Sequence, residues 1–81
     1  MRHTTKLRTL YIGGLPGSIS AELVRTACQR FGVIDDARVL TRREGVIAYV
    51  TFADERAADE ARRALNGSIY AGQRLRVDFA T

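Results

Sequence analysis

The sequence is poor in the residues that build disulfides and metal sites. Cys28 is its only cysteine and His3 its only histidine. These counts exclude an internal disulfide and any zinc site made of several cysteine and histidine ligands. A chain without disulfides fits a reducing, intracellular compartment. We expect it to hold no metal and no cofactor.

Long apolar runs are also lacking. The longest, such as residues 46–50, are far shorter than the roughly 20 residues that a membrane-spanning helix needs. The first residues carry no apolar region typical of a signal peptide. We therefore expect a soluble protein that is not exported and has no membrane partner.

What the chain does contain is the composition of one ordinary globular domain. Of its 81 residues, 46% are hydrophobic and 27% are charged, so we expect it to fold around a single core. Thirteen lysines and arginines against nine acidic residues give a net charge of +4. This excess favours a polyanionic partner only if the positive charges gather on one surface.

The spacing of apolar residues predicts six elements after a polar, basic and flexible arm at residues 1–8. Strands are predicted at residues 9–12, 37–40, 46–52 and 74–79, a first helix at 21–31, and a second helix that Asp54 caps and that runs to about Leu65. The order β-α-β-β-α-β is the ferredoxin-like plan of the α+β class. In this plan two helices cover one face of a four-stranded antiparallel sheet and leave the other face open.

Alternation along the strands places aromatic side chains on that open face. Leu10 and Ile12 form an aliphatic pair that must point at the helices, so Tyr11 points away from them. In the third strand the inward set is Val46, Ala48, Val50 and Phe52, and Tyr49 therefore points outward with Ile47 and Thr51. The two strands are neighbours in this topology, so Tyr11 and Tyr49 can offer stacking surfaces to two nucleobases.

Two motifs carry a family resemblance. LYIGGL at residues 10–15 and GVIAYVTF at residues 45–52 resemble the hexamer and octamer motifs of the RNA recognition motif (RRM) family. The resemblance extends over residues 9–80, with the Phe31-Gly32 and Leu65-Asn66-Gly67 helix ends and the closing LRVDFA. It implies a single RRM domain at 9–80 that binds single-stranded RNA and stacks bases on Tyr11 and Tyr49.

The octamer motif departs from the family pattern at its start. Gly45, Val46 and Ile47 stand where the family usually has a basic residue, a glycine and an aromatic residue. Ile47 can offer only apolar contact, so we expect weaker binding than a platform of three aromatic rings gives. Arg42 or Arg43 could supply the missing basic group from the adjacent loop.

Positive charge is predicted to gather on the sheet side. The arginines of the two helices are matched by acidic neighbours, whereas those of the arm, the open face and its loops are not. Phosphate contacts from these groups would be largely independent of sequence. The predicted RNA contacts besides the two tyrosines are Thr9, Gly13, Arg38, Leu40, Arg42, Arg43, Ile47, Arg74, Arg76 and Asp78, with Lys6 and Arg8 from the arm.

Other functions remain open to different degrees. The main alternative is a protein-binding RRM. It would recruit a peptide through its helical face or through the sheet face that lacks an aromatic residue at Ile47. Catalysis is not expected, because no cluster of Asp, Glu, His or Cys converges on a glycine-rich anion loop. We expect a monomer that takes part in RNA processing in the nucleus or the cytoplasm, with the nucleus favoured. Base preference and membership of a longer protein cannot be predicted from these residues.

Overall fold

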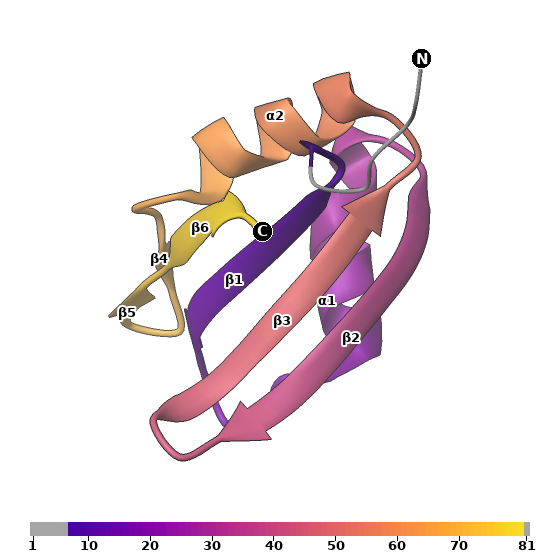
Figure 1. The fold of residues 1–81 in the computed structure, drawn as a ribbon. Helices are drawn as coiled ribbons and strands as arrows, with labels where there is room; N and C mark the ends of the chain where they lie inside the picture. Colours follow the sequence, from indigo (N-terminus) through magenta and orange to yellow (C-terminus); the bar gives the residue numbers. More distant parts are fainter. Residues whose placement is uncertain (1–6, 81) are drawn as a thin grey trace.

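The computed structural model describes residues 7–80, which form one antiparallel sheet, two helices and a small hairpin (Figure 1). In chain order the elements are β1 (Thr9–Leu15), α1 (Ala21–Cys28), the 3₁₀ turn η2 (Gln29–Phe31), β2 (Ile34–Arg42), β3 (Gly45–Phe52), α2 (Glu55–Leu65), β4 (Ile69–Tyr70), β5 (Gln73–Arg74) and β6 (Arg76–Phe79). Within residues 7–80, no helix has both the length and the apolar character needed to cross a membrane.

The large sheet has the strand order β2-β3-β1-β6, and all its neighbouring strands are antiparallel. In Figure 1 α1 lies behind this sheet and α2 along its upper edge, both helices pack into one core with it, and no helix or strand of residues 7–80 covers the front face. This arrangement confirms the predicted ferredoxin-like fold with two helices on one face. The two central strands, β3 and β1, are the ones that bear the sequence motifs.

The core lies between the sheet and the helices, as strand alternation requires. In β3 the buried residues alternate strictly with half-buried ones, and Val50 and Phe52 are fully enclosed. Helix α2 contributes three small buried residues, Ala57, Ala58 and Ala61, which let the helix backbone approach the sheet closely. One face of the sheet is therefore committed to packing, and no helix or strand of residues 7–80 covers the other.

Both helices begin where the sequence predicted. Ser20 and Asp54 are in extended conformation, and their side chains accept hydrogen bonds from the backbone N–H groups of Leu23 (3.1 Å) and Ala57 (2.8 Å). The predicted helix at 21–31 is α-helical only as far as Cys28, after which η2 tightens its end. Gly32 follows, and a Cβ atom there would lie 2.6 Å from the Cβ of Ala57.

All four predicted strands have different bounds in the structure. The first runs to Leu15 instead of ending at Ile12, and the third begins one residue earlier, at Gly45. The second strand runs over Ile34–Arg42 instead of 37–40, because it pairs with β3 from Ile34 to Arg42 despite its polar residues, with one irregularity at Asp35. The last predicted strand, 74–79, is interrupted at Leu75, whose N–H donates to Ser68 and whose C=O accepts from Gly67. Leu75 is thus bonded to the segment after α2, and Arg74 belongs to a separate hairpin.

The β4–β5 hairpin was not predicted. Its two strands pair antiparallel around Ala71 and Gly72, both of which have positive φ (52° and 82°). Positive φ at both central residues is the geometry of a type I′ turn, which favours tight hairpins. The hairpin brings Gln73 and Arg74 toward the start of β6.

The outer edge of β6 is capped by side chains. Ala80 donates its N–H to Thr9, so Val77 and Phe79, which alternate with it, direct their N–H groups away from β1. The Val77 N–H donates to Oδ1 of Asn66 (3.0 Å), and the Phe79 N–H donates to Oδ1 of Asp78 (2.8 Å). Both outward donors of this strand are therefore satisfied within the domain.

Candidate nucleic-acid interface

The register of the sheet arranges the outward side chains of its open face in rows. The central row crosses all four strands and consists of Arg38, Tyr49, Tyr11 and Asp78. The row nearer the β2–β3 turn contains the pairs Leu40–Ile47 and Gly13–Arg76, and the row on the other side contains Asp36, Thr51 and Thr9. The sheet thus brings Tyr11 and Tyr49 together in its middle, with charged side chains at both ends of their row.

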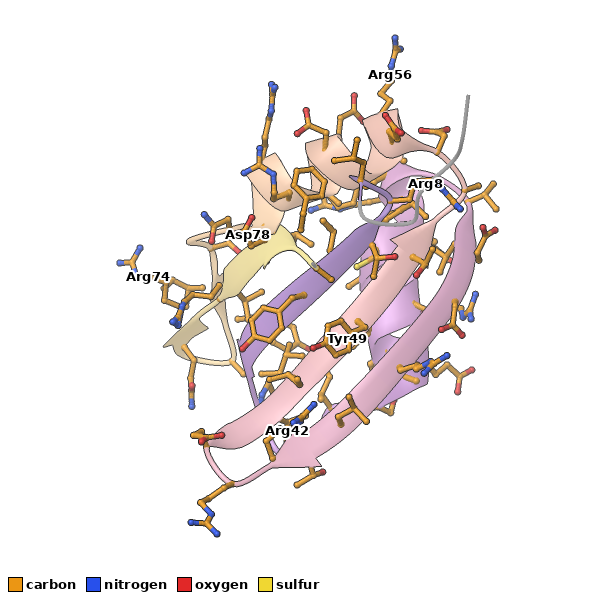
Figure 2. The ribbon with its side chains drawn as sticks, viewed as in Figure 1. Arg8, Arg42, Tyr49, Arg56, Arg74 and Asp78 are labelled. Atoms are coloured by element: carbon orange, nitrogen blue, oxygen red, sulfur yellow. The ribbon has the colours of Figure 1, made fainter. Side chains whose placement is uncertain are left out.

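The two tyrosines form an edge-to-face pair. Their ring centroids lie 6.0 Å apart and the ring planes make an angle of 66°. The N–H of Phe52 donates to the C=O of Arg8, so Tyr11 and Tyr49 occupy a non-hydrogen-bonded pair, in which side chains stand close. Both residues are half-buried, and no helix or strand of residues 7–80 covers them, as Figure 2 shows for Tyr49.

Gly13 supports the Tyr11 ring by having no side chain. A Cβ atom at Gly13 would lie 2.9 Å from Oη of Tyr11 and 3.2 Å from one of its ring carbons. The ring therefore lies along the strand, directly over this glycine. This contact explains why the residue two positions after Tyr11 is a glycine.

A shallow groove of about 620 Å³ continues from the tyrosines toward the β2–β3 turn. Ile47 lines it between the rings and the turn, and three arginines line it from three different strands, namely Arg42, Arg74 and Arg76. The guanidinium group of Arg74 donates to the C=O of Gly67 (3.2 Å). Figure 2 shows Arg42 near the β2–β3 end of the sheet and Arg74 beside the β4–β5 hairpin. The groove therefore joins an aromatic and apolar surface to a positively charged end.

The arginines of the sheet side differ in how they are paired. Nε of Arg38 lies 2.9 Å from a carboxylate oxygen of Asp36. Arg8 donates through Nη1 to the Phe52 carbonyl (2.8 Å) and to Asp35 (3.2 Å). By contrast, four arginines form no ion pair with any residue in the range 7–80, and these are Arg42, Arg43, Arg74 and Arg76.

The arginines of the helical side are only partly paired, since Arg25, Arg30 and Arg56 form no ion pair within residues 7–80. Arg62 and Arg63 both pair with Asp59 on α2 (3.2 and 3.1 Å), and Arg62 also lies over the Phe79 ring. On η2, the guanidinium carbon of Arg30 lies 4.5 Å from the centre of the Phe31 ring. The unpaired arginines at the groove are thus those best placed to meet an anion on the sheet side.

Most of the sequence-predicted contact residues share this face, but they do not all share the groove. Arg43 lies in the exposed β2–β3 turn outside the groove lining, and Thr9 lies in the row farthest from that turn, where its hydroxyl is 2.9 Å from that of Thr51. Arg8 is held beside β3 by its hydrogen bonds, whereas Lys6 lies outside the described residues.

Sequence reasoning missed Glu44 and Gln73, which also line the groove. Gly72, as a turn residue, was the available signal for the hairpin that places Gln73.

Cys28 is the one cysteine in the described part of the chain, residues 7–80. No three His, Cys, Asp or Glu side chains there could together hold a metal ion. Cys28 is buried behind the sheet, and burial raises the pKa of its thiol from the ordinary value of 9.0 to about 11, with a smaller opposing effect of Arg30. The protonated, enclosed thiol is a core residue and a poor nucleophile.

A family model described as the RNA recognition motif matches residues 10–76. A probable splicing factor of Caenorhabditis elegans, arginine/serine-rich 6, is 39% identical over 72 residues, which cover 89% of this chain and 40% of that protein. Four curated relatives that match the chain are longer, and the chain spans only 12–40% of their lengths.

Solved structures share the fold. The crystal structure of the RNA-binding protein PG1 is 30% identical to this chain and has a TM-score of 0.81. The match covers 90% of this chain and 93% of that one. The structure of the Rna15 RRM with bound RNA (GU) has the same TM-score at 22% identity, and the match covers 91% of this chain and 83% of that one.

Proposed function

The chain belongs to the RNA recognition motif family, and from this premise we propose that residues 9–80 bind single-stranded RNA on the open face of the sheet. The observation that supports the proposal is the half-buried pair of Tyr11 and Tyr49 on the open face, beside a groove lined by three arginines that form no ion pair within residues 7–80. Aromatic rings and free cations on one uncovered sheet match the two chemical parts of RNA, its bases and its phosphates.

Two bases stack on the tyrosines in this proposal. Unpaired bases expose the π-face that a ring can cover, and each stacked base contributes about 1–3 kcal/mol. Ile47 continues the surface but supplies only apolar contact to a base or sugar. The affinity is therefore expected to be lower than that of an RRM with three aromatic rings.

Phosphates meet the positively charged end of the groove. Arg42, Arg74 and Arg76 come from β2, β5 and β6, so they can contact successive phosphates of a strand that crosses the sheet. Each neutralised phosphate releases counterions, which makes binding weaker as salt rises. Arg43 is proposed as a further contact from the β2–β3 turn and Arg38 as one at the β2 edge.

The names of the relatives suggest a cellular setting. Curated relatives from Caenorhabditis elegans and Arabidopsis thaliana are described as splicing factors, and we extend RNA processing in the nucleus to this chain by that similarity. The domain is proposed to act as a monomeric binding module and not as an enzyme. Since the relatives are longer, the activity of a whole protein is proposed only at the level of this domain.

One observation favours a second candidate function, the binding of a peptide on the helical side. A small hollow there is lined almost entirely by apolar groups, among them the half-exposed Leu23 of α1 and the exposed Tyr70 of β4. A peptide side chain could enter it without touching the sheet. The two functions differ in the face that they use, so one experiment separates them.

The test is an NMR titration of the isotope-labelled domain with a randomised pool of short single-stranded RNA at low salt. Shifts of amide signals clustered around Tyr11, Tyr49 and Arg76 are the expected result. An unchanged spectrum, or shifts confined to α1 and α2, would overturn the RNA proposal and direct attention to a protein partner.

A further inference from the structure

The row that contains the two tyrosines ends in opposite charges. Asp78 of β6 is the cross-strand neighbour of Tyr11, and Arg38 of β2 is the cross-strand neighbour of Tyr49. Directly opposed residues on one face have Cβ atoms roughly 5 Å apart. A base that lies on Tyr11 with one edge toward β6 therefore meets a carboxylate, which can only accept hydrogen bonds.

The carboxylate of Asp78 is held in one orientation. Its Oδ1 accepts the outward N–H of Phe79 at 2.8 Å, while its Oδ2 accepts no hydrogen bond from residues 7–80. Asp78 also forms no ion pair within that range, although Arg62 and Arg76 line the same hollow. One oxygen is thus fixed by the backbone and the other remains available as an acceptor.

There is room for a base edge beside this acceptor. A hollow of about 400 Å³ at the β6 edge is lined by both Tyr11 and Asp78. An RNA that approaches this face brings negative phosphates toward Asp78, which costs free energy unless the carboxylate receives a hydrogen bond. A base with an exocyclic amino group can donate that bond.

We propose that Asp78 is a specificity residue, and that the position on Tyr11 prefers cytosine to uracil because the cytosine amino group donates to the free carboxylate oxygen. The inference rests on the proposed RNA binding and adds the base that one position selects. Cytosine and uracil have nearly the same size and stacking surface, but uracil presents a carbonyl oxygen where cytosine has its amino group. That oxygen would face the carboxylate and be repelled.

The experiment compares fluorescently labelled hexamers of cytidine and of uridine, so that any binding register places the same base on Tyr11. The wild-type domain should bind the cytidine hexamer on the order of tenfold more tightly. In the variant Asp78→Asn the amide oxygen can still accept from Phe79 N–H, and the amide NH₂ then replaces the free acceptor with a donor. The preference should fall by at least tenfold, to parity or to a preference for uridine.

The matched control is Glu44→Gln, which removes one negative charge from the groove lining away from the tyrosine row. Glu44→Gln should bind both hexamers more tightly than the wild type, because it loses a repulsive charge. Asp78→Asn should bind the uridine hexamer more tightly for the same reason, but it also loses the acceptor for the cytosine amino group, so the cytidine hexamer should not gain in the same way. Only Asp78→Asn should change the ratio of the two affinities, and amide spectra of both variants report whether the fold is intact.

The outcomes separate the two proposals. If neither hexamer binds to the wild type, the proposed function fails and this inference fails with it. If both bind equally, or if Asp78→Asn keeps the wild-type ratio, RNA binding stands and Asp78 is not the reading residue.

Discussion

At the scale of single residues, the stacking surface depends on how each tyrosine is supported. Tyr11 lies over Gly13 and meets the edge of Tyr49, and neither ring is needed to fill the core behind the sheet. The rings can therefore be removed without opening a cavity. This separation makes the aromatic pair open to a direct test.

Replacement of either tyrosine by alanine should weaken binding of single-stranded RNA by about 1–3 kcal/mol, because one base loses its stacking partner. Tyr11→Phe and Tyr49→Phe keep the ring and should retain most of the affinity. Fluorescence anisotropy with a short labelled RNA measures both effects, and thermal unfolding checks the fold. Undiminished affinity in both alanine variants would contradict the stacking model.

Arg42 and Arg43 are sequence neighbours with different surroundings, and they provide a test of the groove. Arg42→Ala should lower affinity for all RNA sequences alike and reduce the slope of log K against log salt by about 1, because one phosphate contact is lost. Arg43→Ala should have a smaller effect, since Arg43 does not line the groove. Affinities measured across a salt series check this order, and equal slopes for both variants would disagree with it.

At the scale of elements, the helices and the sheet meet through small residues, and their ends are fixed by caps. Helix α2 is the clearer case, because Asp54 accepts the Ala57 N–H at 2.8 Å immediately before the buried Ala57–Ala58 pair. The cap thus determines where the helix starts to pack on β3.

Asp54→Ala should lower the free energy of unfolding by about 0.5–2 kcal/mol, because a helix N–H loses its acceptor. Asp54→Ser can still accept the hydrogen bond and should recover most of the loss. Urea unfolding followed by circular dichroism measures the difference. RNA affinity should be unaffected, since Asp54 lies outside the groove.

Local sequence patterns were sufficient to predict strands with alternating apolar residues and helices with capping residues. They were insufficient where hydrogen bonds between distant segments determine the bounds of an element. Strand alternation placed Tyr11 and Tyr49 outward, and the structure agrees. The length of β2 could not be predicted, because its polar residues are held by pairing to β3. The break at Leu75 depends on bonds to Gly67 and Ser68, which no local pattern reveals. That break separates the β4–β5 hairpin from β6 and brings Gln73 to the groove. The sequence alone therefore predicted the tyrosines but not every residue that lines the groove.

At the scale of the whole molecule, stability and binding reside on opposite sides of the sheet. The buried side chains lie between sheet and helices, while the unpaired arginines of the groove lie on or beside the open face. Cys28 belongs to the buried set and is its one ionisable side chain. It therefore links global stability to pH.

Stability should fall as pH rises from 9 to 11. In the unfolded chain the Cys28 thiol ionises near its ordinary pKa of 9.0, whereas burial raises its pKa to about 11 in the fold. The unfolded state thus binds fewer protons in this window, and the Cys28 contribution, at most about 3 kcal/mol, is present below pH 9 and lost by pH 11.

The comparison with Cys28→Ala isolates this contribution from the titration of other groups. The difference in unfolding free energy between wild type and variant should shrink across the window, as measured by urea unfolding at several pH values. A constant difference would mean that the thiol ionises in the folded chain as readily as in the unfolded one.

The capped edge of β6 also limits how copies of this domain could polymerise. A fibril of stacked sheets grows only if each copy offers backbone partners at both outer strands. A strand arriving at β6 would first have to displace the side chains of Asn66 and Asp78 from the Val77 and Phe79 N–H groups. Copies that met along the edge of β2 would form a closed pair with the capped edges facing outward. Elongation would stop at that pair, which favours solubility when the domain is concentrated.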